Sequence, residues 1–147
     1  MARSDAESDA ASALERFVQA QHPAYARALA ELRAGRKTSH WMWYVLPQLR
    51  GLGRSAMAWE YGLDGRDEAA AYAAHPLLGP RLVACVQALL LHADRSAAQM
   101  LGEVDALKLR SCLTLFAAVA PHQACFAQAL QRFYGGKPDP ETLRLLG

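Results

Sequence analysis

The stretch Asp105-Ala-Leu-Lys-Leu-Arg-Ser-Cys-Leu-Thr-Leu-Phe-Ala-Ala-Val-Ala120 decides the fold class of this chain. Its apolar residues Leu109, Leu113 and Phe116 recur at intervals of four and three, which places them on one face of a helix. Pro121 follows directly and ends that helix, because proline has no backbone N–H group to donate. The stretch therefore predicts an amphipathic helix with one buried face.

The same spacing continues outward on both sides of this stretch. A first helix is expected to end at the Gln21-His22-Pro23 turn, and a second to run through Tyr25, Leu29 and Leu32 to a stop at Gly35. Asp139-Pro140-Glu141 has the residues that begin a helix. Alternation with a period of two is absent, so no sheet is expected. We predict an all-α single compact domain of about eight helices over residues 9–147, preceded by a frayed N-terminus over residues 1–8.

Length and composition indicate a soluble helical domain. The chain has 147 residues, of which 52% are hydrophobic and 20% charged. The N-terminus has no apolar secretion signal, and the apolar run over residues 82–91 is too short to span a bilayer. Cys85, Cys112 and Cys125 lack metal-ligand spacing and lie in apolar patterns, so we expect buried thiols in a reducing compartment. These features predict a cytoplasmic protein.

Positive charge gathers in one interval of the sequence. No acidic residue occurs between Glu31 and Glu60, and the same interval holds five basic residues: Arg33, Arg36, Lys37, Arg50 and Arg54. This local charge of about +5 compares with +2 for the whole chain, which leaves about −3 for the rest. Two of the three tryptophans, Trp41 and Trp43, lie within residues 35–53 of this interval. Residues 35–53 are therefore the predicted site.

The segment from Lys37 to Ser39 is the candidate for binding an anion. Ser39 can cap a helix running from about His40 to Leu46, and the free backbone N–H groups of a helix start bind phosphate or carboxylate. Lys37 adds a cation, and Thr38 and Ser39 add hydroxyl groups. The alternative is an ordinary helix cap with solvated basic neighbours. A phosphate-binding loop is excluded, because Arg36 stands where that motif needs glycine.

The two tryptophans of residues 35–53 are expected to have different roles. Trp41 and Trp43 point in nearly opposite directions on a helix, so one belongs to the core and the other can stack against a planar ligand. His40 lies one turn before Trp43 and is an acid–base candidate; the alternative is a structural hydrogen bond. Gln48 either hydrogen-bonds a ligand or ties the glycine-rich loop that follows it.

Asp105 lies in line with the apolar stripe of its helix, where a carboxylate needs a partner. Lys108, three residues later, provides an ordinary intrahelical partner. Alternatively, Asp105 faces a groove holding Lys37 or His40. Ser111 lies on the same helix and is grouped with the ligand-binding candidates. His75-Pro76 is expected to form a turn.

Several motifs of the chain resemble those of a known family. They are Gly35, Lys37, Ser39-His40-Trp41-Met42-Trp43, Pro47-Gln48-Leu49 and Gly51-Leu52-Gly53, followed by matches such as Tyr61-Gly62 and Thr114-Leu115-Phe116. On these residues the chain resembles the family catalogued as domain of unknown function 1810, from about Leu14 to Leu146. The resemblance implies a compact, mainly helical domain and no established activity. Some members are labelled calpastatin, but such inhibitors are long, disordered and repetitive, and this chain is none of those.

These observations support a functional hypothesis and one rival. The hypothesis is a domain that binds a small anionic, partly planar, nucleotide-like metabolite, with an activity, if there is one, of a hydrolase or transferase that needs no metal or cofactor. Its anion ligands are Lys37, Thr38 and Ser39; Trp41 or Trp43 stacks; Gln48, Lys108 and Ser111 complete the pocket; and His40 and Asp105 are the catalytic candidates. The rival is a non-catalytic module whose basic and aromatic patch docks an acidic partner protein. A net charge of only +2 disfavours nucleic acid, and no membrane association is expected.

Overall fold

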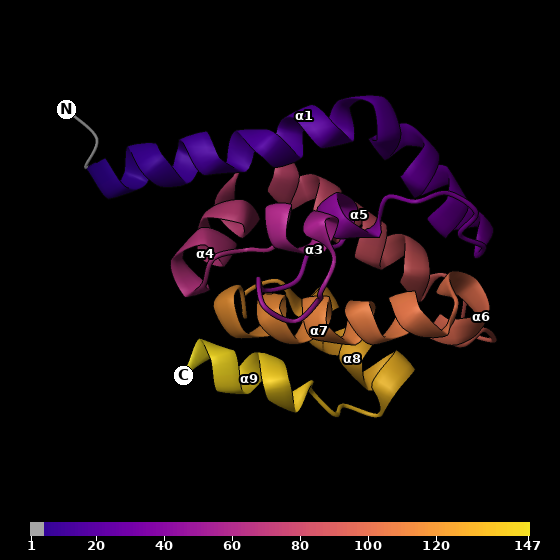
Figure 1. The fold of residues 1–147 in the computed structure, drawn as a ribbon. Helices are drawn as coiled ribbons and strands as arrows, with labels where there is room; N and C mark the ends of the chain where they lie inside the picture. The colour runs from indigo at the N-terminus through magenta and orange to yellow at the C-terminus, as the bar shows by residue number, and fades with distance from the viewer. Residues whose placement is uncertain (1–4) are drawn as a thin grey trace.

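The computed structural model describes the backbone of residues 5–147 and the side chains of residues 12–147. Over this range the chain forms nine helices (Figure 1): α1 (Asp5–Ala34), α2 (Met42–Val45), α3 (Ala56–Glu60), α4 (Arg66–Ala74), α5 (Leu78–Leu90), α6 (Ala97–Leu101), α7 (Glu103–Val119), α8 (Ala124–Tyr134) and α9 (Pro140–Leu146). The described residues form no β-strand; an isolated parallel bridge joins Leu49 to Leu63. The predicted all-α class is confirmed.

The first helix differs from the prediction, because α1 continues through Pro23 instead of ending at residues 21–23. Phe17 and Gln21 before the proline and Ala28 and Leu32 after it are all buried. Burial on both sides of Pro23 offsets the cost of about 3 kcal/mol that an interior proline imposes. Figure 1 shows α1 bending along its length, as expected for a helix that contains a proline.

Of the segment predicted to fray, residues 1–4 lie outside the described residues and residues 5–8 belong to α1. Gly35, predicted as a helix stop, directly follows the end of α1 with a φ of 72°, a left-handed conformation that glycine adopts without strain.

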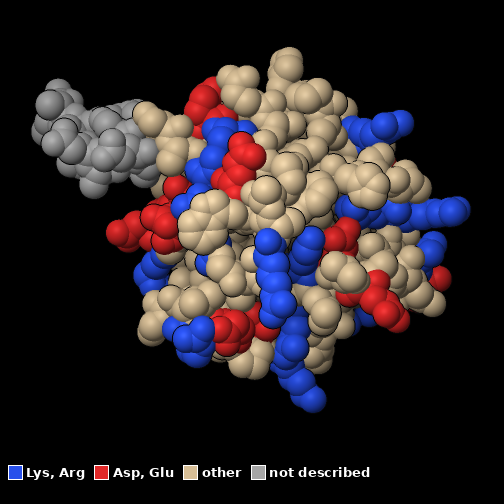
Figure 2. Space-filling view, in the orientation of Figure 1, with Lys and Arg blue, Asp and Glu red and all other residues tan. Residues whose placement is uncertain are grey.

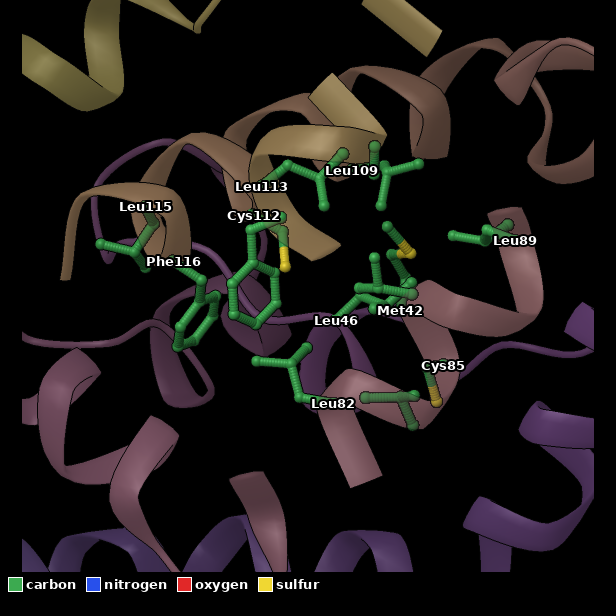
Figure 3. Close-up of a cluster of buried hydrophobic side chains, with 14 of the residues drawn as sticks. Met42, Leu46, Leu82, Cys85, Leu89, Leu109, Cys112, Leu113, Leu115 and Phe116 are labelled. Atoms are coloured by element: carbon green, nitrogen blue, oxygen red, sulfur yellow. The ribbon is translucent and has the colours of Figure 1, made fainter. Parts of the chain in front are cut away.

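The hydrophobic core is formed by α7 and the helices that pack around it. Leu109, Leu113 and Phe116 are fully buried, which confirms the predicted stripe of α7. Figure 3 shows these side chains meeting Met42 and Leu46 from the α2 segment and other apolar side chains from α5. In Figure 1, α1 crosses above this core and α9 lies below α7. In the same view, α4 and α5 lie between α1 and α7.

The predicted His75-Pro76 turn is confirmed, since it separates α4 from α5. Nδ1 of His75 accepts hydrogen bonds from the backbone N–H groups of Leu77 and Leu78, both at 3.1 Å. The imidazole therefore satisfies two of the free donors at the start of α5. The pair α4 and α5 is bent by 85°. Within residues 5–147, no helix taken singly combines the length and apolar composition needed to cross a bilayer; α4 and α5 pass that test only together.

Gly79 permits the close packing of α5 against the end of α4. A Cβ atom at this position would lie 2.3 Å from the carbonyl oxygen of Ala73, which is too close for any relaxed contact. We expect Gly79→Ala to lower the free energy of unfolding by about 2 kcal/mol, because the two backbones must separate. Urea unfolding followed by circular dichroism measures this change, and an unchanged midpoint would contradict the close approach.

The predicted start of α9 is also confirmed. Asp139 Oδ2 accepts hydrogen bonds from Thr142 N–H at 3.0 Å and Thr142 Oγ1 at 2.6 Å, which caps the helix. Arg110 on α7 donates to the carbonyl oxygens of Lys137 and Pro138. These bonds hold the start of α9 against α7, where one side of the candidate site lies.

Candidate functional site

A single carboxylate organises the predicted anion-binding segment. Glu31 is 9% exposed, and its Oε1 accepts hydrogen bonds from Thr38 N–H at 2.8 Å, Ser39 N–H at 3.0 Å and Trp41 Nε1–H at 3.0 Å. Its Oε2 accepts from Ser39 Oγ at 2.6 Å. The Thr38 and Ser39 groups that were predicted to bind the anion of a ligand are therefore already bonded to the carboxylate of Glu31. We call residues 37–41 the Glu31 loop.

The surroundings of Glu31 stabilise its charged form. Burial by itself raises the pKa of this carboxyl group, but the hydrogen bonds from Ser39, Thr38 and Trp41 outweigh it and lower the pKa to about 2. Arg27 adds only a distant ion pair of 3.9 Å from an exposed side chain. The carboxylate is thus a bound anion at any pH near neutrality.

The prediction that Ser39 caps a helix running from His40 to Leu46 is wrong. The helix is α2, limited to Met42–Val45, its N-cap residue is Trp41, and no side chain caps it. Glu31 is the physical reason: it draws the Ser39 hydroxyl and N–H group away from a capping position. The helix start at Ser39, on which the predicted anion site depended, does not form.

Lys37 and Lys108 share one carboxylate. Lys37 Nζ lies 2.9 Å from Asp105 Oδ2, and Lys108 Nζ lies 3.8 Å from Asp105 Oδ1. The Lys37 side chain is 7% exposed and also donates to the carbonyl oxygen of Ser39 at 2.6 Å. Asp105 therefore has the predicted partner on its own helix and also contacts Lys37, while its place in a ligand site stays a prediction. Two ammonium groups on one carboxylate leave an excess of one positive charge.

The tryptophans divide as expected, with one in the core. Trp41 is 1% exposed and Lys37 Nζ lies 5.0 Å from the centroid of its ring. Trp43 is half-buried, and Lys108 Nζ lies 5.5 Å from its ring centroid. The third tryptophan, Trp59 on α3, was not among the predicted site residues, yet it is 63% exposed.

His40 is not joined to the other catalytic candidate. Its side chain is exposed. Its backbone carbonyl oxygen accepts a hydrogen bond from Tyr44 Oη at 3.3 Å. Within the described residues, no hydrogen bond or ion pair links His40 to Asp105, whose partners are Lys37 and Lys108. The two proposed acid–base groups do not form a pair.

Gln48, Lys108 and Ser111 do come together, around a groove of about 320 Å³ that we call the Lys108 groove. It lies between the loop after α2, one face of α7 and the first turn of α9. The residues that line it are Gln48, Leu52, Gly53, Val104, Leu107, Lys108, Ser111, Asp139 and Glu141. Of the ten predicted site residues, three therefore line this groove.

Val104 and Leu107, which also line the groove, were missed because they belong to no motif. Val104 and Leu107 are 68% and 67% exposed, so both present apolar surface to solvent. In the sequence, they stand out only as apolar residues that lie outside the stripe of Leu109, Leu113 and Phe116 and are therefore expected to be exposed. Glu31 was missed too, although it is the acidic residue that directly precedes the basic interval.

The basic interval is less positive in space than in sequence. Lys37 pairs with Asp105, and Arg50 pairs with Asp64 at 3.3 Å, so acidic residues from outside the interval neutralise part of it. On the face shown in Figure 2, basic side chains form a column near the middle of the molecule, with acidic side chains on both sides. On this face, basic and acidic side chains are therefore interleaved.

The cysteines are buried free thiols, as predicted. Burial raises the pKa of Cys85 to about 12, and it raises the pKa of Cys112 as well, so neither thiol ionises near neutral pH. Over the described residues, His, Cys, Asp and Glu side chains form no group of three that could hold a metal ion.

Comparison with known proteins gives a family and a solved structure. The sequence model of the family described as "Protein of unknown function (DUF1810)" matches residues 11–146. The crystal structure of the conserved hypothetical protein Rv1873 from Mycobacterium tuberculosis is similar, with 48% sequence identity and a TM-score of 0.89, over 90% of this chain and 95% of that one. No curated protein matches the chain.

Proposed function

Because the chain belongs to the DUF1810 family, whose description assigns no activity, we propose a function from the Lys108 groove: it binds a small metabolite that carries an anionic group. The observation that carries this proposal is the sharing of Asp105 between Lys37 and Lys108. Asp105 lies closer to Lys37, so the charge of Lys108 is the less neutralised of the two. A ligand anion bound to Lys108 would neutralise this remaining positive charge.

The rest of the groove fits the other parts of such a ligand. Within the described residues, the Gln48 side chain makes no hydrogen bond, which leaves its amide available. Leu52, Val104 and Leu107 offer apolar surface for a planar or apolar portion. From Val104 to Ser111 the groove follows about 10 Å of helix, since an α-helix rises about 1.5 Å per residue. This length suits a mononucleotide-sized molecule.

The far end of the groove is acidic and would favour hydrogen-bond donors. Asp139 Oδ2 already accepts from Thr142 and also from Ser111 Oγ at 3.3 Å, and Glu141 pairs with Arg144. Hydroxyl or amino groups of a ligand fit this end, whereas a second anionic group would be repelled. The proposal is limited to binding, since the exposed His40 gives no support to an acid–base pair with Asp105.

A thermal-shift screen against inorganic phosphate, nucleoside monophosphates and sugar phosphates tests this function. A ligand at about 100 times its Kd stabilises the protein by about 2.7 kcal/mol, which raises Tm by roughly 5–10 °C in a domain of this size. We expect Lys108→Ala to lose most of this shift, because it removes the cation of the groove.

Lys137→Ala is the matched control, since Lys137 is exposed and does not line the groove. It should keep the full shift. Equal shifts in the Lys108→Ala variant and the original protein, or equal losses in both variants, would contradict the anion-binding role of Lys108.

A further inference from the structure

A second groove lies at the corner between α4 and α5, away from the Lys108 groove. Its volume is about 450 Å³, within the range of small-molecule sites. The end of α4, the His75-Pro76 turn, the α5 helix and Gln123 before α8 form its walls. We call it the His75 groove. It shares no lining residue with the Lys108 groove.

The lining of the His75 groove carries no Asp, Glu, Lys or Arg side chain. Charged residues make up 20% of the chain, so a surface groove without one is unusual. Ala73, Pro76 and Val83 supply apolar surface. A charged ligand would lose hydration here without gaining a counter-ion, so the groove favours an uncharged one.

His75 presents a donor of fixed position to this groove. Nδ1 accepts the N–H groups of Leu77 and Leu78, so the ring hydrogen of the neutral imidazole is on Nε2. Within the described residues, no hydrogen bond engages Nε2. Because the two backbone contacts hold the ring, a ligand would bind this donor without first ordering it.

Two glutamine amides complete the polar groups. Gln87 on α5 and Gln123 at the start of α8 are exposed, and Gln123 makes no side-chain cap for α8. Neither side chain forms a hydrogen bond within the described residues. An amide side chain offers both a donor and an acceptor, so the groove as a whole can pair with a ligand that has both.

We infer that the His75 groove binds an uncharged cyclic amide, a ring that carries adjacent C=O and N–H groups. The ligand carbonyl oxygen accepts from His75 Nε2–H, the ligand N–H and C=O groups pair with the Gln87 amide, and the ring packs on Ala73 and Val83. This site is separate from the anionic ligand of the Lys108 groove and does not depend on it.

A titration followed by two-dimensional ¹⁵N–¹H NMR tests the inference with uracil as the probe and orotate, its carboxylate derivative, as the charged comparison. We expect saturable shifts at backbone N–H groups within residues 73–87, with a Kd on the order of 1 mM for a molecule of this size. Orotate should bind these residues about tenfold more weakly, because its carboxylate has no counter-ion there.

Substitutions identify the groups that bind. Gln87→Ala should weaken uracil binding about fivefold, whereas Gln128→Ala, the same change on the exposed side of α8 and outside the groove, should not. His75→Asn keeps an acceptor for α5 through Oδ1 but lacks the Nε2–H donor, so it should weaken binding by a similar factor.

Four outcomes would overturn the inference. They are the absence of saturable shifts, shifts centred on the Lys108 groove instead, equal affinity for orotate, and equal affinities in the Gln87→Ala and Gln128→Ala variants. If His75→Asn does not fold, the comparison of the two glutamine variants decides the matter alone.

Discussion

We expect Glu31→Gln to lower the free energy of unfolding by about 3 kcal/mol at pH 7. The pKa of Glu31 is lowered from 4.5 to about 2 in the folded protein, and each unit of pKa corresponds to about 1.4 kcal/mol. Glutamine has the same shape but no charge, and its NH₂ group replaces one of the two accepting oxygens. The NH₂ group cannot accept from the Ser39 hydroxyl, and the N–H groups of Thr38, Ser39 and Trp41 then bond to a neutral carbonyl oxygen instead of a carboxylate.

The effect of Glu31→Gln depends on pH in a direction that follows from the lowered pKa. The unfolded chain takes up a proton at Glu31 near pH 4.5, whereas the folded protein resists until about pH 2. The contribution of Glu31 is therefore complete above about pH 4.5 and is lost as pH falls to about 2. The difference in unfolding free energy between the two proteins should shrink over this window.

Urea unfolding at several pH values measures both effects. Glu60→Gln is the matched control, because Glu60 is exposed and its carboxylate makes no contact recorded in the described residues. This control should stay within about 0.5 kcal/mol of the original protein. A Glu31→Gln variant as stable as the control at pH 7 would show that the Glu31 loop does not depend on the carboxylate.

Lys37→Met should cost about 2–3 kcal/mol of stability. The substitution keeps the long side chain beside Trp41 but removes the ammonium group that binds Asp105 and the Ser39 carbonyl oxygen. Breaking a buried ion pair costs about 3–5 kcal/mol. The loss should be smaller here, because Asp105 is 18% exposed and keeps its contact with Lys108.

A double-mutant cycle with Asp105→Asn separates the ion pair from other effects. If the Lys37–Asp105 contact is the cause, the double variant loses at least about 1 kcal/mol less than the sum of the single losses. Strict additivity would contradict the pairing. Because Lys37 is buried in this pair, its loss should act mainly on stability, whereas the loss of Lys108 should act mainly on ligand binding.

The sequence could predict the helices whose apolar spacing is regular and whose ends carry a distinct signal. Leu109, Leu113 and Phe116 identified α7, and Asp139 identified the start of α9. At Pro23 the sequence predicted the end of a helix, but α1 continues through this residue. The cost of an interior proline is a property of the backbone, while the burial of α1 on both sides of it depends on helices that come later in the chain.

The site was harder to predict, because hydrogen bonds of a loop depend on which distant group faces it. The donors at Thr38, Ser39 and Trp41 were visible as donors, but nothing local indicated that Glu31, on the preceding helix, would accept from them. Asp105 gave a better signal, since a carboxylate in line with an apolar stripe requires a cation nearby. The Lys108 groove was predicted only in part: Gln48, Lys108 and Ser111 were among the candidates, whereas exposed apolar residues such as Val104 and Leu107 belong to no motif.

The Glu31 loop also sets a limit on how this region of the chain can vary in length. Residues 37–41 form neither helix nor strand, and such segments usually tolerate insertions and deletions. Here the loop is fixed at one end by Lys37 and at the other by Trp41, with Glu31 bonded to the residues between. Inserting or deleting one residue would move the Thr38, Ser39 and Trp41 donors away from the Glu31 carboxylate. The hydrogen bonds to Glu31 therefore fix the length of this irregular segment.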